Sequence, residues 1–234
     1  HVQQAGHQGP KVLLIHGTGA SGHTWRDLLW PLAEHAQVWV VDLPGHGFSS
    51  LAAGQGMSMS GMAASLHALM QTLEVAVNVF IGHSAGAAIA ARMVVDHSLT
   101  PQALIGINPA WLPLPGLAGL LFPPTAKLLA LTAYVPQWFA KQASSPGMLD
   151  KLLDSTGSVL DDRGKALYAR LVANPDHAQG ALNMMAAWDL SSGPCAATTA
   201  LPCAYFGWRQ RPHRATRTGP ASTDLAVKRP LEAP

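Results

Sequence analysis

Residues 82–86, Gly-His-Ser-Ala-Gly, include the side chain best suited to chemistry in this sequence. A serine in this G-x-S-x-G spacing can present its hydroxyl as a nucleophile when a strand precedes it and a helix follows. The flanking residues must be small because the backbone turns sharply at the serine and is strained there. Ser84 is therefore the candidate nucleophile for acyl transfer. The N-terminus of a following helix would favour negative charge beside it.

Acyl transfer also needs hydrogen-bond donors aimed at the oxygen that becomes negatively charged, and backbone N–H groups provide them without reorganisation. Ala85 follows the serine at the expected helix start, and Thr18 lies in a glycine-rich turn after the first expected strand. We predict that the backbone amides of Thr18 and Ala85 form this oxyanion site, although Thr18 also fits an ordinary turn.

The general base and its acid partner stay unassigned. After Ser84 the histidines are His97, expected to cap a helix, His177, expected in a solvated loop, and His213, which lies among arginines that disfavour its protonation. Asn108 follows the fourth expected strand, but an amide cannot stabilise an imidazolium as a carboxylate does. Three further histidines belong to turn motifs and are expected to shape loops or line the pocket: His16, His46 and His83.

Two other kinds of site were weighed. Residues 17–22 spell G-x-G-x-x-G after an expected strand, with Asp42 at about the spacing of a dinucleotide site, but that interpretation explains neither His16 nor the Ser84 motif. Cys195 and Cys203 lack the spacing of a zinc site. We therefore predict no cofactor and no metal.

Strands and helices alternate in the first half of the chain, which predicts an α/β fold with a mostly parallel sheet and helices on both faces. Short apolar, β-branched runs indicate strands, and apolar residues at helical spacing indicate helices. The expected strands are residues 12–15, 38–42, 77–81 and 103–107, and the expected helices are 24–35, 57–73 and 85–97.

After residue 110 the strand pattern gives way to helical stretches at residues 126–131, 147–153 and 164–172. We interpret residues 1–110 as an incomplete α/β core and residues 111–190 as an inserted helical cap. Residues 191–234 contain five of the nine arginines and six prolines without strand or helix periodicity. We predict that this tail is irregular, either disordered or read in a shifted frame, and that the late strands are missing.

The charges also divide along the chain, with 9 basic and 11 acidic side chains in residues 1–190 and 6 and 2 in residues 191–234. A mildly acidic body excludes nucleic acid as the expected partner. Prolines interrupt the apolar part of the cap too often for a membrane span. We expect these apolar residues to pack on the main domain, and contact with a membrane surface or a lipophilic ligand is the alternative. The chain opens at His1 without methionine, so we expect its start to be missing, and we expect a cytoplasmic location.

Three motifs resemble those of the α/β-hydrolase superfamily: residues 16–20, His-Gly-Thr-Gly-Ala; residues 42–48, Asp-Leu-Pro-Gly-His-Gly-Phe; and residues 82–89, Gly-His-Ser-Ala-Gly-Ala-Ala-Ile. Within this superfamily the chain is most similar to the magnesium-chelatase accessory proteins of bacteriochlorophyll biosynthesis. Residues 25–27 and 90–93 also match, but that narrower likeness rests on the run at residues 82–88 and on the cap segments at residues 167–171 and 183–190.

The resemblance implies a nucleophile elbow at Ser84, followed later in the chain by an acid and a histidine on loops after further strands. Because no such segment is evident here, we expect a weak or inactive esterase. Two functions follow. The first is an accessory role in tetrapyrrole metabolism, with a porphyrin-like ligand and possible contact with a magnesium chelatase. The second is a serine hydrolase acting on a lipophilic carboxylic ester, impaired by the missing acid and base.

Overall fold

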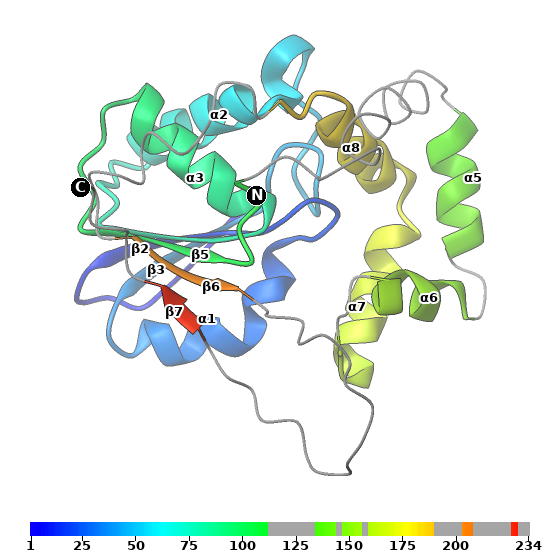
Figure 1. Ribbon diagram of the computed structural model, residues 1–234, viewed down its shortest axis with the longest axis horizontal. Coiled ribbons are helices and arrows are strands. Elements are labelled where there is room, and N and C mark those ends of the chain that lie inside the picture. Colours follow the sequence, from blue (N-terminus) through cyan, green and yellow to red (C-terminus); the bar gives the residue numbers. More distant parts are fainter. Residues whose placement is uncertain (112–133, 144–146, 156–158, 190–202, 208–225, 229–234) are drawn as a thin grey trace.

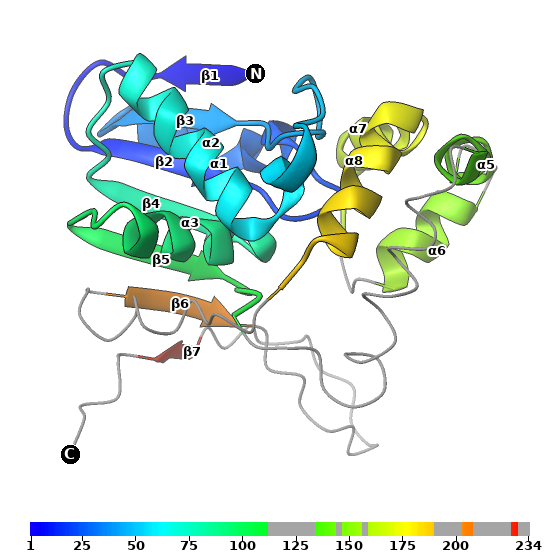
Figure 2. The same cartoon turned by 90° about the horizontal axis from the view of Figure 1, so that it is seen from above.

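The computed structural model describes residues 1–111, 134–143, 147–155, 159–189, 203–207 and 226–228. Seven strands in these ranges form one sheet in the order β1-β3-β2-β4-β5-β6-β7 (Figures 1 and 2). The strands are β1 (Val2–Ala5), β2 (Lys11–Ile15), β3 (Gln37–Val41), β4 (Val79–His83), β5 (Ala103–Ile107), β6 (Cys203–Gly207) and β7 (Ala226–Lys228). The five central strands are parallel, whereas β1 and β7 run antiparallel to their neighbours at the two edges.

The sheet is covered on both faces, which explains why its central strands are nearly continuous runs of Val, Leu and Ile. Helices α2 (Met59–Thr72) and α3 (Ala85–Asp96) lie on one face and α1 (Arg26–Ala33) on the other (Figure 1). Alternate residues of β2 therefore enter two cores. Leu13 and Ile15 pack in the core that includes α2 and α3, and Val12 and Leu14 pack in the core that includes α1.

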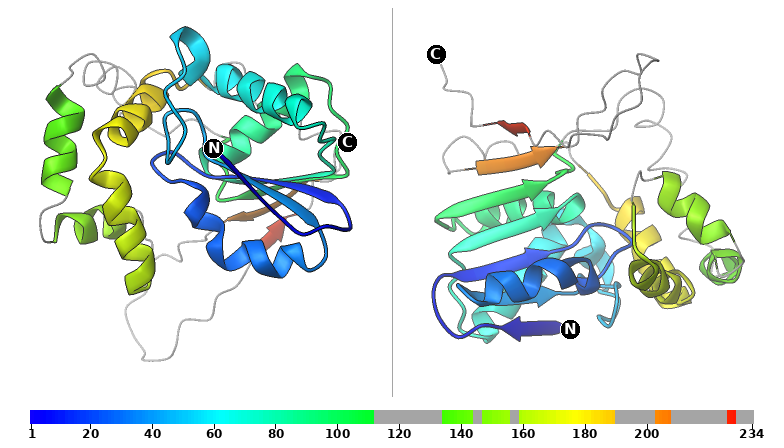
Figure 3. Two further views of the ribbon diagram at one scale, coloured as in Figure 1. Left: turned by 180° about the vertical axis from the view of Figure 1, so that it is seen from behind. Right: turned by 90° about the horizontal axis from the view of Figure 1, so that it is seen from below.

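Four helices stand apart from the sheet, beyond the carboxyl ends of its parallel strands (Figures 2 and 3). They are α5 (Tyr134–Ala143), α6 (Met148–Ser155), α7 (Asp162–Val172) and α8 (Pro175–Ala186). Ligand sites of open α/β sheets lie at this edge of the sheet. We call these four helices the cap.

The predicted α/β architecture is confirmed, and each of the four predicted strands is present within two residues of its expected ends. The cap boundaries at residues 110 and 190 remain predictions, and the helix expected at residues 126–131 lies outside the described residues. Two short 3-10 helices, η1 (Gly22–Trp25) and η2 (Gly54–Met57), precede α1 and α2. Strand β1 and helices α5 and α8 were not predicted.

The expectation that no strand follows residue 190 is wrong for two segments. Residues 203–207 pair with β5 in parallel, from Leu104 opposite Cys203 to Ile107 opposite Phe206. Strand β7 then pairs with β6. An unpaired edge of β5 would leave a row of backbone N–H and C=O groups without partners, and a short apolar segment such as Cys-Ala-Tyr-Phe can supply them. This short apolar segment was not recognised as a strand because the surrounding residues are rich in arginine and proline.

Candidate functional site

Ser84 occupies a strained turn between β4 and α3. Its backbone angles are φ 51° and ψ −118°, a conformation that side-chain-bearing residues rarely adopt and that costs on the order of 1–3 kcal/mol. The surrounding backbone stabilises this conformation. The Ser84 N–H donates to the carbonyl of Ile107 over 2.9 Å, and the Ser84 carbonyl accepts from the amides of Ala87 (3.2 Å) and Ala110 (3.1 Å). The end of β5 therefore fixes the serine at the edge of the sheet that faces the cap.

The glycines on either side of the motif leave no room for a side chain, as the sequence pattern predicted. A methyl group on Gly82 would overlap the backbone of Ala87, and one on Gly86 would overlap the carbonyl oxygen of Ile15. Helix α3 consequently starts directly against β2. The serine thus lies in a sharp turn between the end of β4 and the start of α3, and its role as a nucleophile remains a prediction.

The glycine-rich loop after β2 passes directly beside the serine. A Cβ atom on Gly17 would lie 3.0 Å from Cβ of Ser84. Thr18, the next residue, is half-buried and its hydroxyl donates to the sulfur of Met184 in α8 over 3.4 Å. Ala85 is the first residue of α3, where backbone N–H groups have no partner within the helix. The structure therefore brings Thr18, Ala85 and Ser84 together, while the proposed oxyanion role of the two amides remains a prediction.

Within the described part of the chain, no imidazole forms a hydrogen bond with the Ser84 hydroxyl. His16 instead joins two loops, because its Nδ1 donates to the carbonyl of Gly17 (2.8 Å) and its Nε2 accepts from the amide of Leu43 (3.0 Å). His46 donates from Nδ1 to the carbonyl of Pro44 over 2.9 Å. The expectation that these two histidines shape loops is confirmed. His213 lies outside the described residues.

Burial keeps both of these imidazoles neutral. Desolvation, followed by the nearby His46, lowers the pKa of His16 from 6.5 to about 3, and desolvation lowers the pKa of His46 to about 4. The His83 ring beside the serine is half-buried, and desolvation lowers its pKa as well. His97 follows the last residue of α3, as expected, and stacks on His67 with ring centroids 3.9 Å apart.

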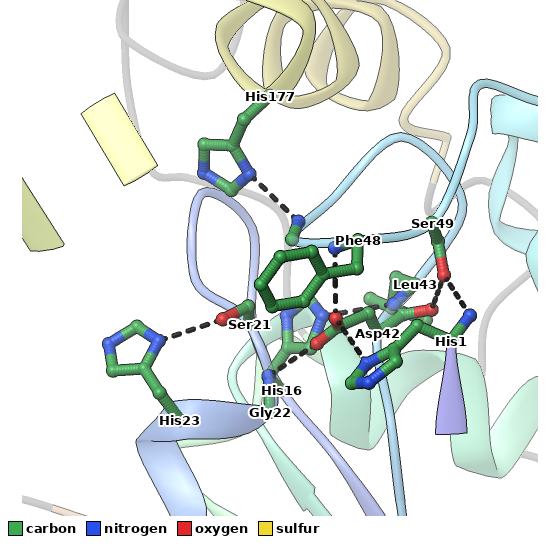
Figure 4. A network of polar contacts seen from close by, with 11 residues as sticks. His1, His16, Ser21, Gly22, His23, Asp42, Leu43, Phe48, Ser49 and His177 are labelled. Carbon is green, nitrogen blue, oxygen red and sulfur yellow. Dashed lines mark hydrogen bonds and ion pairs between the residues drawn. The ribbon is translucent and has the colours of Figure 1, made fainter. Parts of the chain in front are cut away.

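Asp42 organises the loops that surround this edge of the sheet (Figure 4). Its Oδ1 accepts from the amide of Gly22 over 2.6 Å, and its Oδ2 accepts from the amide of Phe48 over 3.0 Å and contacts Nδ1 of His1 at 2.8 Å. These contacts use both carboxylate oxygens and the Gly22 amide, which argues against the dinucleotide interpretation. The outer side of Asp42 borders a groove of about 340 Å³ whose lining does not include Ser84.

His177 was expected in a solvated loop, and this expectation is wrong. It lies in the first turn of α8, and only 3% of its surface is exposed. Its Nδ1 accepts from the amide of Gly47 over 3.2 Å (Figure 4). Its Nε2 donates to the carbonyl of Gly19 over 3.1 Å. The sequence does contain a helix-start signal, since Asn174 caps α8 and Pro175 is its first residue.

One face of α8 forms the contact between cap and core. His177, Gly180 and Met184, spaced at i, i+3 and i+7, are all buried. A methyl group on Gly180 would overlap the carbonyl oxygen of Gly45, so the two backbones touch. The loop at residues 43–47, the loop at residues 17–19 and α8 therefore form one packed unit beside Ser84.

Helix α7 makes a second connection between cap and core. Arg26 forms an ion pair with Asp161, the N-cap residue of α7, and the ring of His23 contacts Tyr168 edge-on with centroids 4.6 Å apart. The segment Trp25-Arg26-Asp27, selected from the sequence for its likeness to the chelatase accessory proteins, thus lies at a cap contact. This segment is separate from the motifs that contain the nucleophile and the oxyanion amides.

In the ranges that the structure covers, no group of three or more His, Cys, Asp and Glu side chains could hold a metal ion. The same ranges contain no helix with the length and apolar character needed to cross a membrane. Cys195 lies outside them, and Cys203 is described only as part of β6.

Comparison with curated proteins finds a chelatase subunit and several enzymes among the relatives of this chain. The chain is 42% identical over 183 residues to the magnesium-chelatase 30 kDa subunit of Rhodobacter capsulatus, covering 78% of this chain and 63% of that protein. It is 32% identical over 95 residues to the pimeloyl-[acyl-carrier protein] methyl ester esterase of Vibrio cholerae, covering 41% of this chain and 35% of the esterase. It is 31% identical over 103 residues to the putative carbamate hydrolase RutD of Escherichia coli O157:H7, covering 44% and 38%. The chain thus spans less than two thirds of each of these relatives.

Solved structures share the fold. The epoxide hydrolase CorEH superposes with a TM-score of 0.69 at 23% identity, over 88% of this chain and 77% of its own. An α/β-hydrolase-fold protein from Burkholderia ambifaria superposes with a TM-score of 0.65 at 20% identity, over 87% and 74%. The family model described as alpha/beta hydrolase fold matches residues 10–148, more than half of the chain. This chain therefore belongs to the α/β-hydrolase family.

Proposed function

We propose that this chain is an accessory protein of a magnesium chelatase in bacteriochlorophyll biosynthesis, and that it holds a tetrapyrrole under the cap beside Ser84. The observation that carries the proposal is the 42% identity to the magnesium-chelatase 30 kDa subunit over 183 residues. A stretch of that length cannot fit within the 107 residues that end at β5, so the likeness extends into the cap. The esterase and carbamate hydrolase match only 41% and 44% of the chain.

The surroundings of the serine are compatible with a flat, apolar ligand. Trp111 directly follows Ala110, whose amide binds the Ser84 carbonyl, and Trp188 follows α8. Both indoles are partly buried and pack against the larger core. Aromatic faces of this kind bind planar ring systems by stacking and by burying apolar area. The buried imidazoles nearby are neutral and add no charge that an apolar macrocycle would have to desolvate.

A porphyrin titration tests the ligand. Addition of magnesium protoporphyrin IX to the full chain is expected to shift the porphyrin absorbance and quench tryptophan fluorescence with saturation. Trp188→Ala should weaken binding by about tenfold, because a buried aromatic contact is worth on the order of 1–2 kcal/mol. Trp30→Ala is the matched control, since Trp30 is 68% exposed on α1. Absence of saturable binding by the unaltered chain would exclude the tetrapyrrole site.

Association with the chelatase needs a separate measurement. The full chain is expected to co-elute with purified magnesium-chelatase subunits on size exclusion, or to change the rate of magnesium insertion into protoporphyrin. If the chain neither co-elutes with the subunits nor changes the insertion rate at micromolar concentrations, the accessory role is ruled out.

A second candidate function is a serine hydrolase acting on a lipophilic carboxylic ester. The conformation of Ser84, with Ala85 at the helix start and Thr18 on the neighbouring loop, supports this candidate. A serine hydroxyl without a base is a poor nucleophile at neutral pH, so turnover is expected to be weak. A fluorophosphonate probe discriminates between the two functions. Labelling that disappears in Ser84→Ala but persists in Ser65→Ala, an exposed serine of α2, would favour the hydrolase.

A further inference from the structure

His177 is the one cap side chain whose described hydrogen bonds reach both loops beside the serine. It accepts the Gly47 amide proton at Nδ1 and donates from Nε2 to the Gly19 carbonyl. The two partners are 28 residues apart in the sequence and belong to the loops after β3 and after β2. One imidazole therefore joins α8, the loop after β2 and the loop after β3, which are far apart in the sequence.

This arrangement requires a single protonation state. A neutral imidazole has one acceptor and one donor nitrogen, and both are used here. Adding a proton at Nδ1 would place its N–H against the N–H of Gly47. The cationic ring could keep the bond to Gly19 but not the bond to Gly47, and a buried amide without a partner costs about 1–3 kcal/mol.

We propose that His177 is a positioning residue that latches the cap onto the core and sets the loop carrying Thr18 beside Ser84, and that its protonation releases the latch. Gly19 is the second residue after Gly17, whose Cα faces Cβ of Ser84. Seven residues after His177 on α8, Met184 accepts the hydroxyl proton of Thr18. Helix α8 thus forms hydrogen bonds with two successive residues of this loop, Thr18 and Gly19. We therefore expect movement of α8 to change the position of the Thr18 amide.

The groups facing His177 come from each element packed against it. The ring of His46 lies 5.3 Å away, and the ring of His16 lies 5.3 Å beyond it. His177 disfavours a positive charge on His23 in η1, whereas the hydrogen bond to the Gly19 carbonyl and the carboxylate of Asp42 favour protonation of His177. Burial is the largest influence and lowers the pKa of His177 below its ordinary value. The neutral, latched form is therefore the form present at neutral pH, and acid favours release.

Hydrogen exchange tests the latch without any ligand. Peptides covering residues 16–22 and 43–49 are expected to be protected at pH 7. In His177→Phe, which keeps an aromatic ring but neither hydrogen bond, both peptides should lose about tenfold or more of their protection, because each bond is worth about 1 kcal/mol. His35→Gln, at an exposed histidine after α1, is the matched control and should leave them unchanged. Equal protection in His177→Phe and in the unaltered chain would overturn the proposal.

A pH series separates a latch from a simple packing role. Between pH 7 and pH 5 the unaltered chain should lose protection factor in these two peptides more than in residues 79–91, which form β4 and the start of α3. His177→Gln has an amide donor and acceptor that cannot be protonated, so it should restore protection at pH 7 and flatten the pH dependence. A pH dependence as steep in His177→Gln as in the unaltered chain would also overturn the proposal. The first comparison uses only the unaltered chain, so it does not depend on whether a variant folds.

The connection to the site rests on the proposed function and is measured last. If the unaltered chain binds magnesium protoporphyrin IX, His177→Phe should weaken binding by about fivefold or more, as expected of coupled sites. Unchanged affinity would overturn the link to Ser84. If the unaltered chain does not bind the porphyrin, the tetrapyrrole proposal fails, while the exchange measurements still decide whether the latch exists.

Discussion

Gly180 of α8 packs against Gly45 so closely that a methyl group on either residue would meet the backbone of the other. Gly45 also has φ +72°, a conformation that disfavours any side chain. Together with His177 and Met184, this contact fixes how the cap meets the core. The loops after β2 and β3 lie between the cap helix and the Ser84 turn. Changes at the cap contact should therefore be felt at the serine.

Gly180→Ala is expected to lower the free energy of unfolding by about 1–3 kcal/mol, the usual cost of forcing a methyl group into a packed interface. Alanine otherwise favours a helix over glycine by about 1 kcal/mol, so Gly61→Ala at a half-exposed position of α2 should be neutral or stabilising. Urea unfolding of both variants provides the comparison. If Gly180→Ala were as stable as Gly61→Ala, the close contact between α8 and Gly45 would be wrong.

Ser84→Gly should stabilise the protein while removing any reactivity of the serine. The angles φ 51° and ψ −118° are strained for serine and accessible to glycine, which should yield about 1 kcal/mol after the greater entropy of unfolded glycine is subtracted. Ser84→Ala keeps Cβ and therefore the strain, so its unfolding midpoint should stay close to that of the unaltered chain. Thermal unfolding of the pair isolates the backbone effect, and a glycine variant less stable than the alanine variant would contradict it.

Acid should destabilise the fold from about pH 6.5 downward. The imidazoles of His16 and His46 have pKa values of about 3 and about 4 in the folded protein, against 6.5 in the unfolded chain. At a pH between the pKa of the folded state and 6.5, each of these histidines binds more protons in the unfolded state. The free energy of unfolding therefore falls as the pH falls, by about 1.4 kcal/mol per pH unit for each such histidine. Urea midpoints at pH 7, 5.5 and 4.5 should decrease in that order. His46→Gln should show a shallower decrease, and a midpoint that rises toward pH 4.5 would refute this assignment.

Asp42→Asn is expected to destabilise the fold by about 2–3 kcal/mol, because Gly22 and Phe48 donate to a carboxylate and such charge-assisted bonds are the stronger kind. Asp27→Asn is the control. Asp27 pairs with Arg26 at the surface with 84% of its side chain exposed, so its loss should change stability by less than about 1 kcal/mol. Chemical unfolding at pH 7 distinguishes the two, and equal effects would mean that Asp42 does not hold the loops together.

The sequence predicted the parts of the fold that local pattern determines. The runs at residues 12–15 and 103–107 are apolar and β-branched, and both are strands. The need for small residues at positions 82 and 86 could be predicted, because a sharp strand-to-helix turn crowds the residues on both sides of the serine. Strand β6 could not, since Cys203–Gly207 becomes a strand only by pairing with the edge of β5, nearly 100 positions earlier.

The site was predicted less completely than the fold. Ser84, Thr18 and Ala85 were selected because they belong to one motif and one loop, and their roles remain predictions. His177 was misplaced because its partners, Gly19 and Gly47, are 158 and 130 positions away and expose only backbone atoms. A histidine that binds main chain leaves no complementary side chain for a pattern to detect. The helix-start signal at Asn174 and Pro175 would have placed it on α8, although not against the loops.

The meeting of Gly180 with Gly45 has a consequence for how such proteins diversify. Where two main chains touch, neither partner has a side chain that can be shortened or lengthened to adjust the spacing. The distance between α8 and the loop at residues 43–47 is therefore fixed at this contact, while α7 makes its own contacts with the core through Arg26 and His23. Farther along the chain, Met184 and Trp188 do have side chains that pack against the core, so substitutions there can alter packing volume without changing the contact of Gly180 with Gly45.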